Sequence, residues 1–487
     1  TLTGNATFSP SGASATLTLS SAVTGGFSLT KTGTGTLILS GSGSTYSGGT
    51  TISAGTLELL GSGSLGSTTA TLLMNGGTLD IHGNITLDVG ALTGTGNVIE
   101  NRLGSSTATL RFGNGDASGT YSGIIDAGAG IVKIEKVGTG TEILSGANTF
   151  VGTATISGGT LQIGAGGTSG TLGTGAGAVI DNATLAFNRS DTFTVANAIS
   201  GSGVLNQIGS GTTILTGNNG YSGGTTISAG TLQVGDGGTS GSIGTGAVTN
   251  NAALVFNRSD ALLSVGGVIS GTGTVTQAGT GTTTLTAVST YTGATAVNAG
   301  TLLVNGSLAS ASAVAVAGGA TVGGSGTING DVTAASGINP STGGRVLGGN
   351  GTTGTTLTVA GTLTMNSNSI VQLALGPSST HSTLALTGNY SFDASQTFQF
   401  INLGATAGTY ENIITTSAPA SDPGVGGWTI DTNFNFGFVG TFNWDGQNVD
   451  LTLTAVPEPG TWAAATLALV GLLAHQRKRL KKILDRS

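Results

Sequence analysis

The stretch that decides the fold is KTGTGTLILSGSGSTYSGGTTISAGTLEL, residues 31–59. Short runs within it, such as 36–39 and 56–59, alternate apolar residues with small polar ones. Alternation with a period of two is typical of a β-strand with one buried face. Gly-Gly, Ser-Gly and Ala-Gly steps separate the runs, and glycine readily adopts the positive φ angles of tight turns. The stretch therefore predicts short strands joined by tight turns.

The same stretch recurs three more times, beginning at Lys136, Gln207 and Gln277. Each copy carries one aromatic residue, and the successive intervals between these residues are 104, 71 and 70 residues. The period is therefore about 70 residues, and the first interval holds about 34 more, enough for one or two further coils. The four aromatic residues are expected at corners or capping a turn, with a ligand platform as the alternative; they are Tyr46, Phe150, Tyr221 and Tyr291.

The composition narrows the class of protein. Of 487 residues, 90 are Gly, 7% are charged and none is Cys. A disulfide scaffold and a Cys-based metal site are excluded, and the glycines lack the three-residue period of collagen. No Pro lies between Pro10 and Pro340, which favours strands paired on both sides, since Pro removes a ladder hydrogen bond. Stacked short strands without helices predict an all-β solenoid of roughly 20–25 residues per coil.

The net charge of −7 is unevenly placed along the chain. Residues 1–455 hold 8 Lys/Arg and 19 Asp/Glu, a net charge of −11. Residues 456–487 hold 6 Lys/Arg and 2 Asp/Glu, a net charge of +4. A thinly acidic body argues against nucleic acid as a partner, because phosphate binding needs clustered cations.

The repeated unit resembles the autotransporter-associated β-strand repeat, through its Gly-Thr-Gly-Thr, Leu-x-Leu-Ser-Gly, Gly-Gly-Thr-x-Ile and Ala-Gly-Thr-Leu elements. The stretch from Ala309 resembles the last passenger segment of such proteins. The resemblance implies a right-handed parallel β-helix that is secreted or exposed at the cell surface. We therefore expect repeat coils over 1–307, terminal solenoid coils over 308–376, a cap over 377–455 and a tail over 456–487.

The region before the tail is rich in aromatic residues. Residues 390–444 hold 11 of the chain's 23 aromatic side chains, and 434–438 alternates Phe with small residues. A small β cap is expected here, because an open last coil would leave a sheet edge. The alternative is a carbohydrate-binding face on Trp428, Trp444 and Phe438.

The tail combines three parts in a fixed order. Val456-Pro457-Glu458-Pro459-Gly460 is a rigid, extended peptide because two prolines fix φ. An apolar stretch and a basic cluster follow, and this order predicts a transmembrane helix with its cations on the cytoplasmic side. The membrane-anchor residues are Trp462, Leu467, Leu469, Val470, Leu472 and Leu473, and the basic stop is Arg477, Lys478, Arg479, Lys481 and Lys482.

The tail resembles the PEP-CTERM sorting signal, which Val456 to Pro459 match position by position, with Gly460 in the small-residue slot. The resemblance implies an exosortase-type membrane protease as partner and an anchor in the bacterial inner membrane. Cleavage of the tail would then release the body to the envelope, cell surface or medium. It also implies a bacterium that makes exopolysaccharide, which is a second expected partner.

Catalytic patterns are scarce in this sequence. The three histidines, His82, His381 and His475, lie far apart, and Gly-rich phosphate loops would need a following helix. The Arg–Asp steps at 189–191 and 258–260 are interpreted as turn pairs. Two charge clusters are interpreted as solvated surface charges; they are Asp80, Asp88, Glu100, Arg102, Arg111 and Asp116, and Lys133, Glu135, Lys136 and Glu142.

The sequence thus predicts an exported, non-enzymatic surface or matrix protein with a structural or adhesive role. No cofactor, metal or catalytic residue is expected. The alternative is a polysaccharide lyase or hydrolase on a β-helix, for which aligned Asp and Glu residues in a groove would be the mark.

Overall fold

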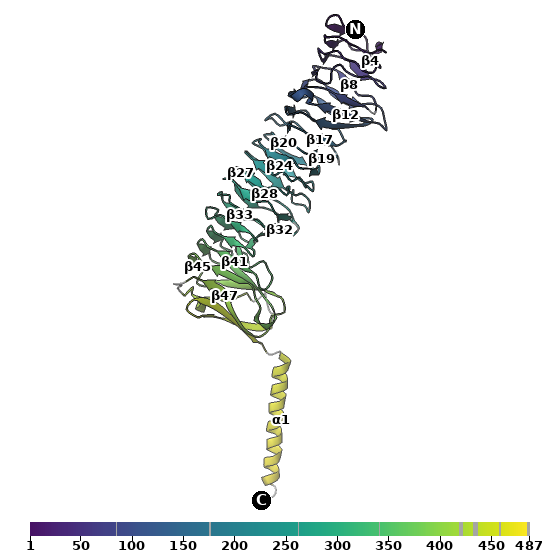
Figure 1. The fold of residues 1–487 in the computed structure, drawn as a ribbon. Helices are drawn as coiled ribbons and strands as arrows, with labels where there is room; N and C mark the ends of the chain where they lie inside the picture. The colour runs from purple at the N-terminus through teal and green to yellow at the C-terminus, as the bar shows by residue number, and fades with distance from the viewer. Residues whose placement is uncertain are drawn as a thin grey trace. The chain divides into compact units, whose positions relative to one another are not determined.

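The computed structural model describes residues 1–83, 85–174, 177–261, 263–339, 341–417, 422–431, 437–456 and 459–484. Its strands stack as successive coils (Figure 1). The chain divides into two compact units, Thr1–Leu302 with Gly306–Val314, and Leu303–Asn305 with Ala315–Ser487. The predicted parallel β-solenoid is confirmed by the strand pairing within each unit.

The first unit begins with three faces of parallel strands. One sheet continues through β1 (Ala6–Phe8), β3 (Leu29–Lys31), β5 (Thr50–Ile52), β7 (Leu72–Met74), β10 (Leu92–Gly94), β13 (Gly119–Tyr121), β16 (Thr141–Leu144), β18 (Thr160–Ile163), β20 (Thr184–Phe187), β23 (Val204–Gln207), β25 (Thr225–Ile227), β27 (Val248–Asn250) and β30 (Ile269–Ser270). A second holds β2 (Thr16–Leu19), β4 (Thr36–Leu39), β6 (Thr56–Leu59), β8 (Thr78–Asp80), β11 (Val98–Asn101) and β14 (Ile124–Gly128). A third holds β9 (Thr86–Asp88), β12 (Thr107–Phe112), β15 (Ile131–Lys136), β17 (Ala154–Ile156), β19 (Val179–Asp181) and β22 (Ile199–Ser200).

The later coils of this unit continue the pattern with β21 (Thr192–Val195), β24 (Thr212–Leu215), β26 (Thr231–Val234), β28 (Ala253–Phe256), β29 (Leu263–Val265), β31 (Thr274–Gln277), β32 (Thr282–Leu285), β33 (Thr295–Val297), β34 (Thr301–Val304), β35 (Ser307–Leu308) and the short η1 (Asn114–Asp116). Thr16 pairs with Thr36 and Thr36 with Thr56, so this coil takes 20 residues. The alternation seen in the sequence becomes the core, because Leu37, Leu57 and their counterparts are fully buried.

Turn glycines allow the coils to stack. Gly55 has a φ of +66°, and a Cβ placed on it would collide with the carbonyl oxygens of Gly35 and Gly33 in the preceding coil. A side chain here would therefore meet both backbone strain and a steric clash. The high glycine content follows from turns of this kind.

The second unit uses longer coils and ends differently. Its strands are β36 (Val314–Val316), β37 (Thr321–Gly323), β38 (Thr327–Ile328), β39 (Val332–Ala334), β40 (Arg345–Gly348), β41 (Thr356–Val359), β42 (Leu363–Met365), β43 (Ile370–Leu375), β44 (Thr383–Leu386), β45 (Tyr390–Ser391), β46 (Thr397–Asn402), β47 (Gly408–Thr416), β48 (Thr429–Ile430), β49 (Phe438–Trp444) and β50 (Asn448–Ala455), with 3-10 turns at η2 (Pro377–Ser379) and η3 (Val425–Gly427). Ile370 pairs with Thr397, 27 residues later. The last pairings, β47 with β50 and β50 with β49, are antiparallel.

An aromatic cluster lies where the pairing changes direction. The ring of Phe398 is 4.4 Å from that of Phe442 and 4.8 Å from that of Trp428, measured between centroids. Phe392 adds a contact of 5.0 Å to Trp428. The aromatic residues of this region therefore build a core under the antiparallel strands. Phe434 and Phe436 lie outside the described residues.

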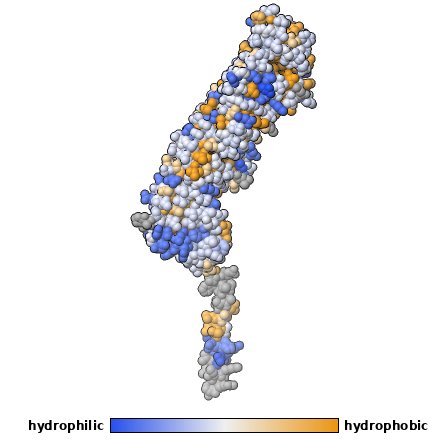
Figure 2. Space-filling model, viewed as in Figure 1, coloured by the Kyte–Doolittle hydropathy of each residue, from blue (hydrophilic) through white to orange (hydrophobic). Residues whose placement is uncertain are grey.

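The last described element is α1 (Pro459–Leu484), the one helix of more than three residues in the described ranges. In Figure 2 its exposed apolar side chains precede a hydrophilic stretch. Within the described residues, no helix has both the length and the apolar character required to cross a membrane. The described part of the tail therefore gives no support to the predicted transmembrane helix.

Candidate functional site

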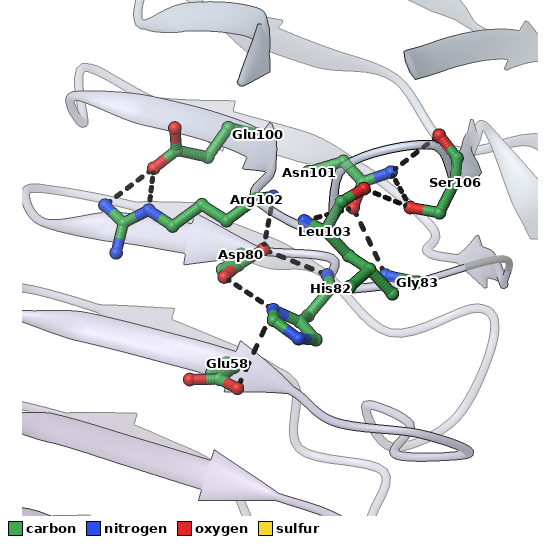
Figure 3. A network of polar contacts seen from close by, with 9 residues as sticks. All are labelled: Glu58, Asp80, His82, Gly83, Glu100, Asn101, Arg102, Leu103 and Ser106. Atoms are coloured by element: carbon green, nitrogen blue, oxygen red, sulfur yellow. Dashed lines mark hydrogen bonds and ion pairs between the residues drawn. The ribbon is translucent and has the colours of Figure 1, made fainter. Parts of the chain in front are cut away.

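The interval between the first two copies of the repeat carries the densest charge of the solenoid. Three carboxylates lie on neighbouring strands in one register, with Glu58 on β6 opposite Asp80 on β8, and Asp80 opposite Glu100 on β11 (Figure 3). Figure 2 shows a hydrophilic patch in the region of β8 and β12. Like charges directly opposite each other on adjacent strands are unfavourable, so these carboxylates need compensation.

Asp80 receives that compensation mainly from the backbone. Its Oδ1 accepts hydrogen bonds from the backbone nitrogens of His82 at 3.0 Å and Arg102 at 3.1 Å. Its Oδ2 lies 3.2 Å from Nδ1 of His82, which is also 3.8 Å from Glu58. Arg102 pairs with Glu100 at 2.7 Å. Asp80 is 2% exposed, so its carboxylate stabilises the turn through these hydrogen bonds and does not face solvent.

A second charged ladder lies on the third sheet. Asp88 on β9, Arg111 on β12 and Glu135 on β15 share one register. Arg111 donates to Asp88 at 3.2 Å and to Glu135 at 2.8 Å. The hydrogen bond that Arg111 donates to Glu135 raises the pKa of Arg111, and the charges of Glu135 and Asp88 add to the effect. One cation thus links two carboxylates across three coils.

These ladders do not assemble an acid–base site. The carboxylates are aligned, as a β-helical lyase or hydrolase would require, but the central one, Asp80, is buried and engaged by two backbone amides. Among the described residues, no group of three or more His, Asp or Glu side chains is placed to hold a metal ion. The remaining members of the expected clusters, Asp116 and Lys133, join neither ladder.

The structure separates the second expected charge cluster. Glu135 faces outward on β15, whereas Lys136 and Glu142 point into the solenoid and are fully buried. Lys136 donates through Nζ to the carbonyl oxygens of Val137, Gly138 and Gly158. The interpretation of Lys136 and Glu142 as solvated surface charges is therefore wrong. Alternation along the strand, with 135 outward and 136 inward, is the signal that could have shown this.

Glu142 is an acid buried inside the solenoid. Neither of its carboxylate oxygens has a hydrogen-bond partner among the described residues. Burial raises the pKa of Glu142 to about 8, against the opposing charge of Lys136. The carboxyl group is therefore mostly protonated at neutral pH.

The Arg–Asp steps form the expected turn pairs. Arg189 and Asp191 lie 2.7 Å apart, and Arg258 and Asp260 lie 2.6 Å apart. The sequence did not show that each guanidinium is also buried under the preceding loop. There Arg189 donates to the carbonyl oxygens of Gly170 and Thr168, both at 2.6 Å.

The four aromatic landmarks lie inside the solenoid. Phe150 is 2% exposed and the three tyrosines are 0% exposed. The hydroxyl groups of Tyr46, Tyr221 and Tyr291 each bond the hydroxyl of a threonine four residues later, at 2.6–2.7 Å. A ligand platform on these residues is excluded because no ring face is accessible.

The proposed glycan-binding face is corrected as well. Trp428 is 8% exposed and packs in the aromatic cluster. Phe438 and Trp444 are half-buried on the same face of β49 as Phe442, which packs against Phe398. The alternating side chains of a strand thus turn all three rings toward the core.

The tail residues are only partly described. Pro457 and Glu458 lie outside the described residues, as do the side chains of Pro459, Gly460, Trp462 and Lys482. The side chain of Val456 is exposed. On α1, the apolar residues Leu467, Leu469, Val470, Leu472 and Leu473 are 58–72% exposed, and Arg477, Lys478, Arg479 and Lys481 are also exposed.

Comparison with known proteins identifies the repeat. The model of the passenger-associated-transport repeat matches residues 29–59, 134–163, 205–234 and 275–304. The chain carries four passenger-associated-transport repeats. All four matches lie at the predicted copies of the sequence unit.

Two adhesins are similar to this chain. The adhesin BmaC autotransporter of Brucella suis biovar 1 (strain 1330) is 34% identical over 194 residues, which cover 36% of this chain and 6% of that adhesin. The crystal structure of the Haemophilus influenzae Hap adhesin matches 90% of this chain and 56% of that chain, with 14% identity and a TM-score of 0.31. This chain therefore spans a small part of the length of the BmaC relative.

Proposed function

We propose that this chain is an exported, non-enzymatic β-solenoid of the bacterial cell surface with an adhesive role. The observation that carries the proposal is the set of four passenger-associated-transport repeats, which build continuous coils and are accompanied by similarity to an autotransporter adhesin. A stack of hydroxyl-rich coils with few charges holds side chains at regular spacings. Solenoids of this kind offer long surfaces for recognition.

Attachment of bacteria tests the adhesive role. Cells that lack the chain are compared with cells that carry the full chain, on abiotic surfaces and on immobilised exopolysaccharide. We expect attachment to fall without the chain and to return with it. A chain that reaches the cell surface, shown by labelling intact cells, yet leaves attachment unchanged would contradict the adhesive role.

We further propose that the tail is a sorting signal read by an exosortase-type membrane protease. The support is the order of the Pro-Glu-Pro motif at 457–459, the exposed apolar residues of α1 and the exposed cations that follow. The apolar face and cations of α1 are suited to contact with an anionic membrane surface. Exopolysaccharide is the partner proposed for the released body.

Replacement of the motif tests the sorting proposal. Pro457, Glu458 and Pro459 are changed together to Ala, and mass spectrometry follows the C-terminus of the full chain in cells. We expect the tail to be retained and the chain to accumulate at the inner membrane. Changing Thr461 and Thr466 to Ser provides a control outside the motif, and loss of the tail at the normal rate in the motif variant would overturn the proposal.

A further inference from the structure

Two intervals between repeat copies share a buried arginine corner. After the second copy, Arg189 lies under the loop 164–170, donates to Gly170 and Thr168, and pairs with Asp191. After the third copy, Arg258 does the same, donating to Gly241 and Thr239, both at 2.6 Å. The two guanidinium groups thus fill the space between a loop and the next coil. They provide hydrogen bonds to carbonyl oxygens that would otherwise be buried without partners.

The interval after the first copy has no arginine at this position. Thr184 opens the strand that pairs with Thr160, and Arg189 follows five residues later. Thr78 occupies the same place, because it pairs with Thr56 at the start of β6. Five residues after Thr78 is Gly83. The loop that follows the strand is also shorter: Gly-Ser-Leu-Gly at 63–66 begins four residues after Leu59, the end of β6, whereas Gly-Thr-Leu-Gly at 170–173 begins seven residues after Ile163, the end of β18.

Among the described residues, a hollow borders the counterpart of this loop in the first interval. Its volume is about 250 Å³. The hollow is bounded by the shortened loop, including Gly63, Ser64 and Thr68, and by the strand residues Thr86 and Asp88. Gly63 is the counterpart of Gly170, whose carbonyl oxygen accepts a hydrogen bond from Arg189. Among the described residues, no donor contacts the carbonyl oxygen of Gly63.

We propose that this hollow binds the guanidinium group of a ligand, such as an arginine side chain of a partner polypeptide. The ligand would take the place that Arg189 and Arg258 occupy in the later intervals. The carbonyl oxygens of the loop would accept its hydrogen bonds, and Asp88 would supply the carboxylate that Asp191 and Asp260 supply there. The inference goes beyond the adhesive role and does not depend on it.

The local charge favours a cation. The Oδ1 of Asp88 accepts hydrogen bonds from Arg111 and Asn114, and no described residue donates a hydrogen bond to its Oδ2. Arg111 also forms an ion pair with Glu135, so two carboxylates share one positive charge. Residues 60–133 hold five Asp/Glu and three Lys/Arg, a net charge of −2. The later intervals, 164–204 and 235–274, each hold two Asp and one Arg, a net charge of −1. A guanidinium at this hollow would therefore reduce an excess of negative charge.

Titration of the full chain with N-acetylarginine methylamide tests the proposal. Binding is followed by calorimetry and by the amide NMR signals of Gly63 and Gly66. The matched probe is the citrulline derivative, which has nearly the same shape but no charge. We expect saturable binding of the arginine derivative, with the citrulline derivative weaker by about tenfold or more, because a charge-assisted hydrogen bond is lost.

Two variants locate the binding. Asp88→Asn is expected to weaken binding of the arginine derivative by about tenfold, whereas Asp126→Asn removes a charge elsewhere in the same interval and should leave it unchanged. Equal affinity for the two derivatives, wild-type affinity in Asp88→Asn, or no saturable binding would each overturn the proposal. A neutral sugar that shifts the Gly63 and Gly66 signals while the arginine derivative does not would assign the hollow to a polyol. Attachment of bacteria is a separate measurement, so the adhesive role can stand if this proposal fails.

Discussion

The first two copies of the repeat and the last two meet the same packing requirement with different side chains. The first two begin with a buried lysine, whose Nζ donates to three carbonyl oxygens of adjacent turns. The last two begin with a buried glutamine, whose Nε2 donates to two carbonyl oxygens of its own turn. The residues are Lys31, Lys136, Gln207 and Gln277, each at most 1% exposed.

The difference shows what this position of the repeat requires. The turn that follows presents carbonyl oxygens to the interior, and a buried carbonyl oxygen without a donor is unfavourable. Either an ammonium group or an amide can provide the donors. The neighbour six residues later varies with the choice, and only the glutamine copies place a threonine there; the four neighbours are Leu37, Glu142, Thr213 and Thr283.

Glu142→Thr is the substitution with the largest expected effect. It places in the second copy the threonine that the third copy has at the same position, Thr213. The pKa of Glu142 rises from 4.5 to about 8 on folding, so between these pH values the folded chain binds more protons than the unfolded chain. Stability therefore falls as pH rises through this window, by on the order of 5 kcal/mol. We expect Glu142→Thr to remove that fall, as measured by hydrogen exchange of the coil's amides from pH 4 to 9.

The control for this prediction is Glu135→Gln. Glu135 is on the outer face and pairs with Arg111, so its removal should leave the fall between pH 4.5 and 8 in place. A wild-type pH profile in Glu142→Thr would contradict the assignment of the fall to Glu142.

Lys31→Met tests whether the donors at the start of a copy are essential. The substitution keeps the length of the side chain but leaves three buried carbonyl oxygens without a donor. We expect the first copy to lose about 3 kcal/mol of stability, seen as faster hydrogen exchange and earlier proteolytic cleavage near residues 31–59. Lys31→Gln, which copies the later repeats, should lose clearly less; equal losses in the two variants would show that the amide cannot replace the ammonium group.

Asp181→Asn is expected to stabilise the chain above pH 6. Asp181 is fully buried, its Oδ2 has no hydrogen-bond partner, and burial raises its pKa to about 6. Its counterpart one repeat later is Asn250, which donates to the carbonyl oxygen of Thr274. Folding favours the protonated acid, so stability falls as pH rises from about 4 to 6, by about 3 kcal/mol.

The measurement for Asp181→Asn is the thermal midpoint as a function of pH. The variant should match the wild type below pH 4 and exceed it above pH 6. Asp191→Asn, which breaks the surface-facing pair with Arg189, should instead destabilise the chain at neutral pH. A destabilised Asp181→Asn variant at pH 7 would show that the arrangement around Asn250 cannot form at the earlier site.

Gln207→Met and Gln277→Met should differ by a small amount. The Oε1 of Gln207 accepts a hydrogen bond from Thr213 at 2.6 Å, whereas the Oε1 of Gln277 has no partner among the described residues. Both variants lose the same two donor bonds, and only the first also leaves a threonine hydroxyl unpaired. We expect Gln207→Met to lose about 1 kcal/mol more, by hydrogen exchange in the two coils; equal losses would mean that the Thr213 contact contributes nothing.

Much of the fold could be predicted from local pattern. Alternation in runs such as 36–39 indicated strands, and the recurrence of one unit indicated stacked coils, because identical strands in register bury a continuous core. The arginine turn pairs at 189–191 and 258–260 could also be predicted from the sequence, because the Arg and the Asp of each pair lie two residues apart. These features depend on residues close together in the chain.

The candidate sites could not be predicted in the same way. Lys136 and Glu142 look like surface charges in sequence, and Trp428 looks like a binding residue, yet all three are buried. Their surroundings are supplied by coils 20 or more residues away, as in the pairing of Glu142 with Gly119. Burial in a solenoid depends on which neighbour lies above and below, and a single strand does not contain that information.

The sequence by itself determined the class of architecture, the number and position of the repeat copies and the composition of the tail. These follow from periodicity, turn residues and charge, all of which are local properties of the chain. Only the tertiary structure decided that the aromatic landmarks are internal, that buried lysines and glutamines donate hydrogen bonds to the turns, and that arginine packs under the loop in two intervals while a hollow borders the loop of the first. The physical reason is that hydrogen-bond partners, desolvation and space come from the stacking of coils distant in sequence.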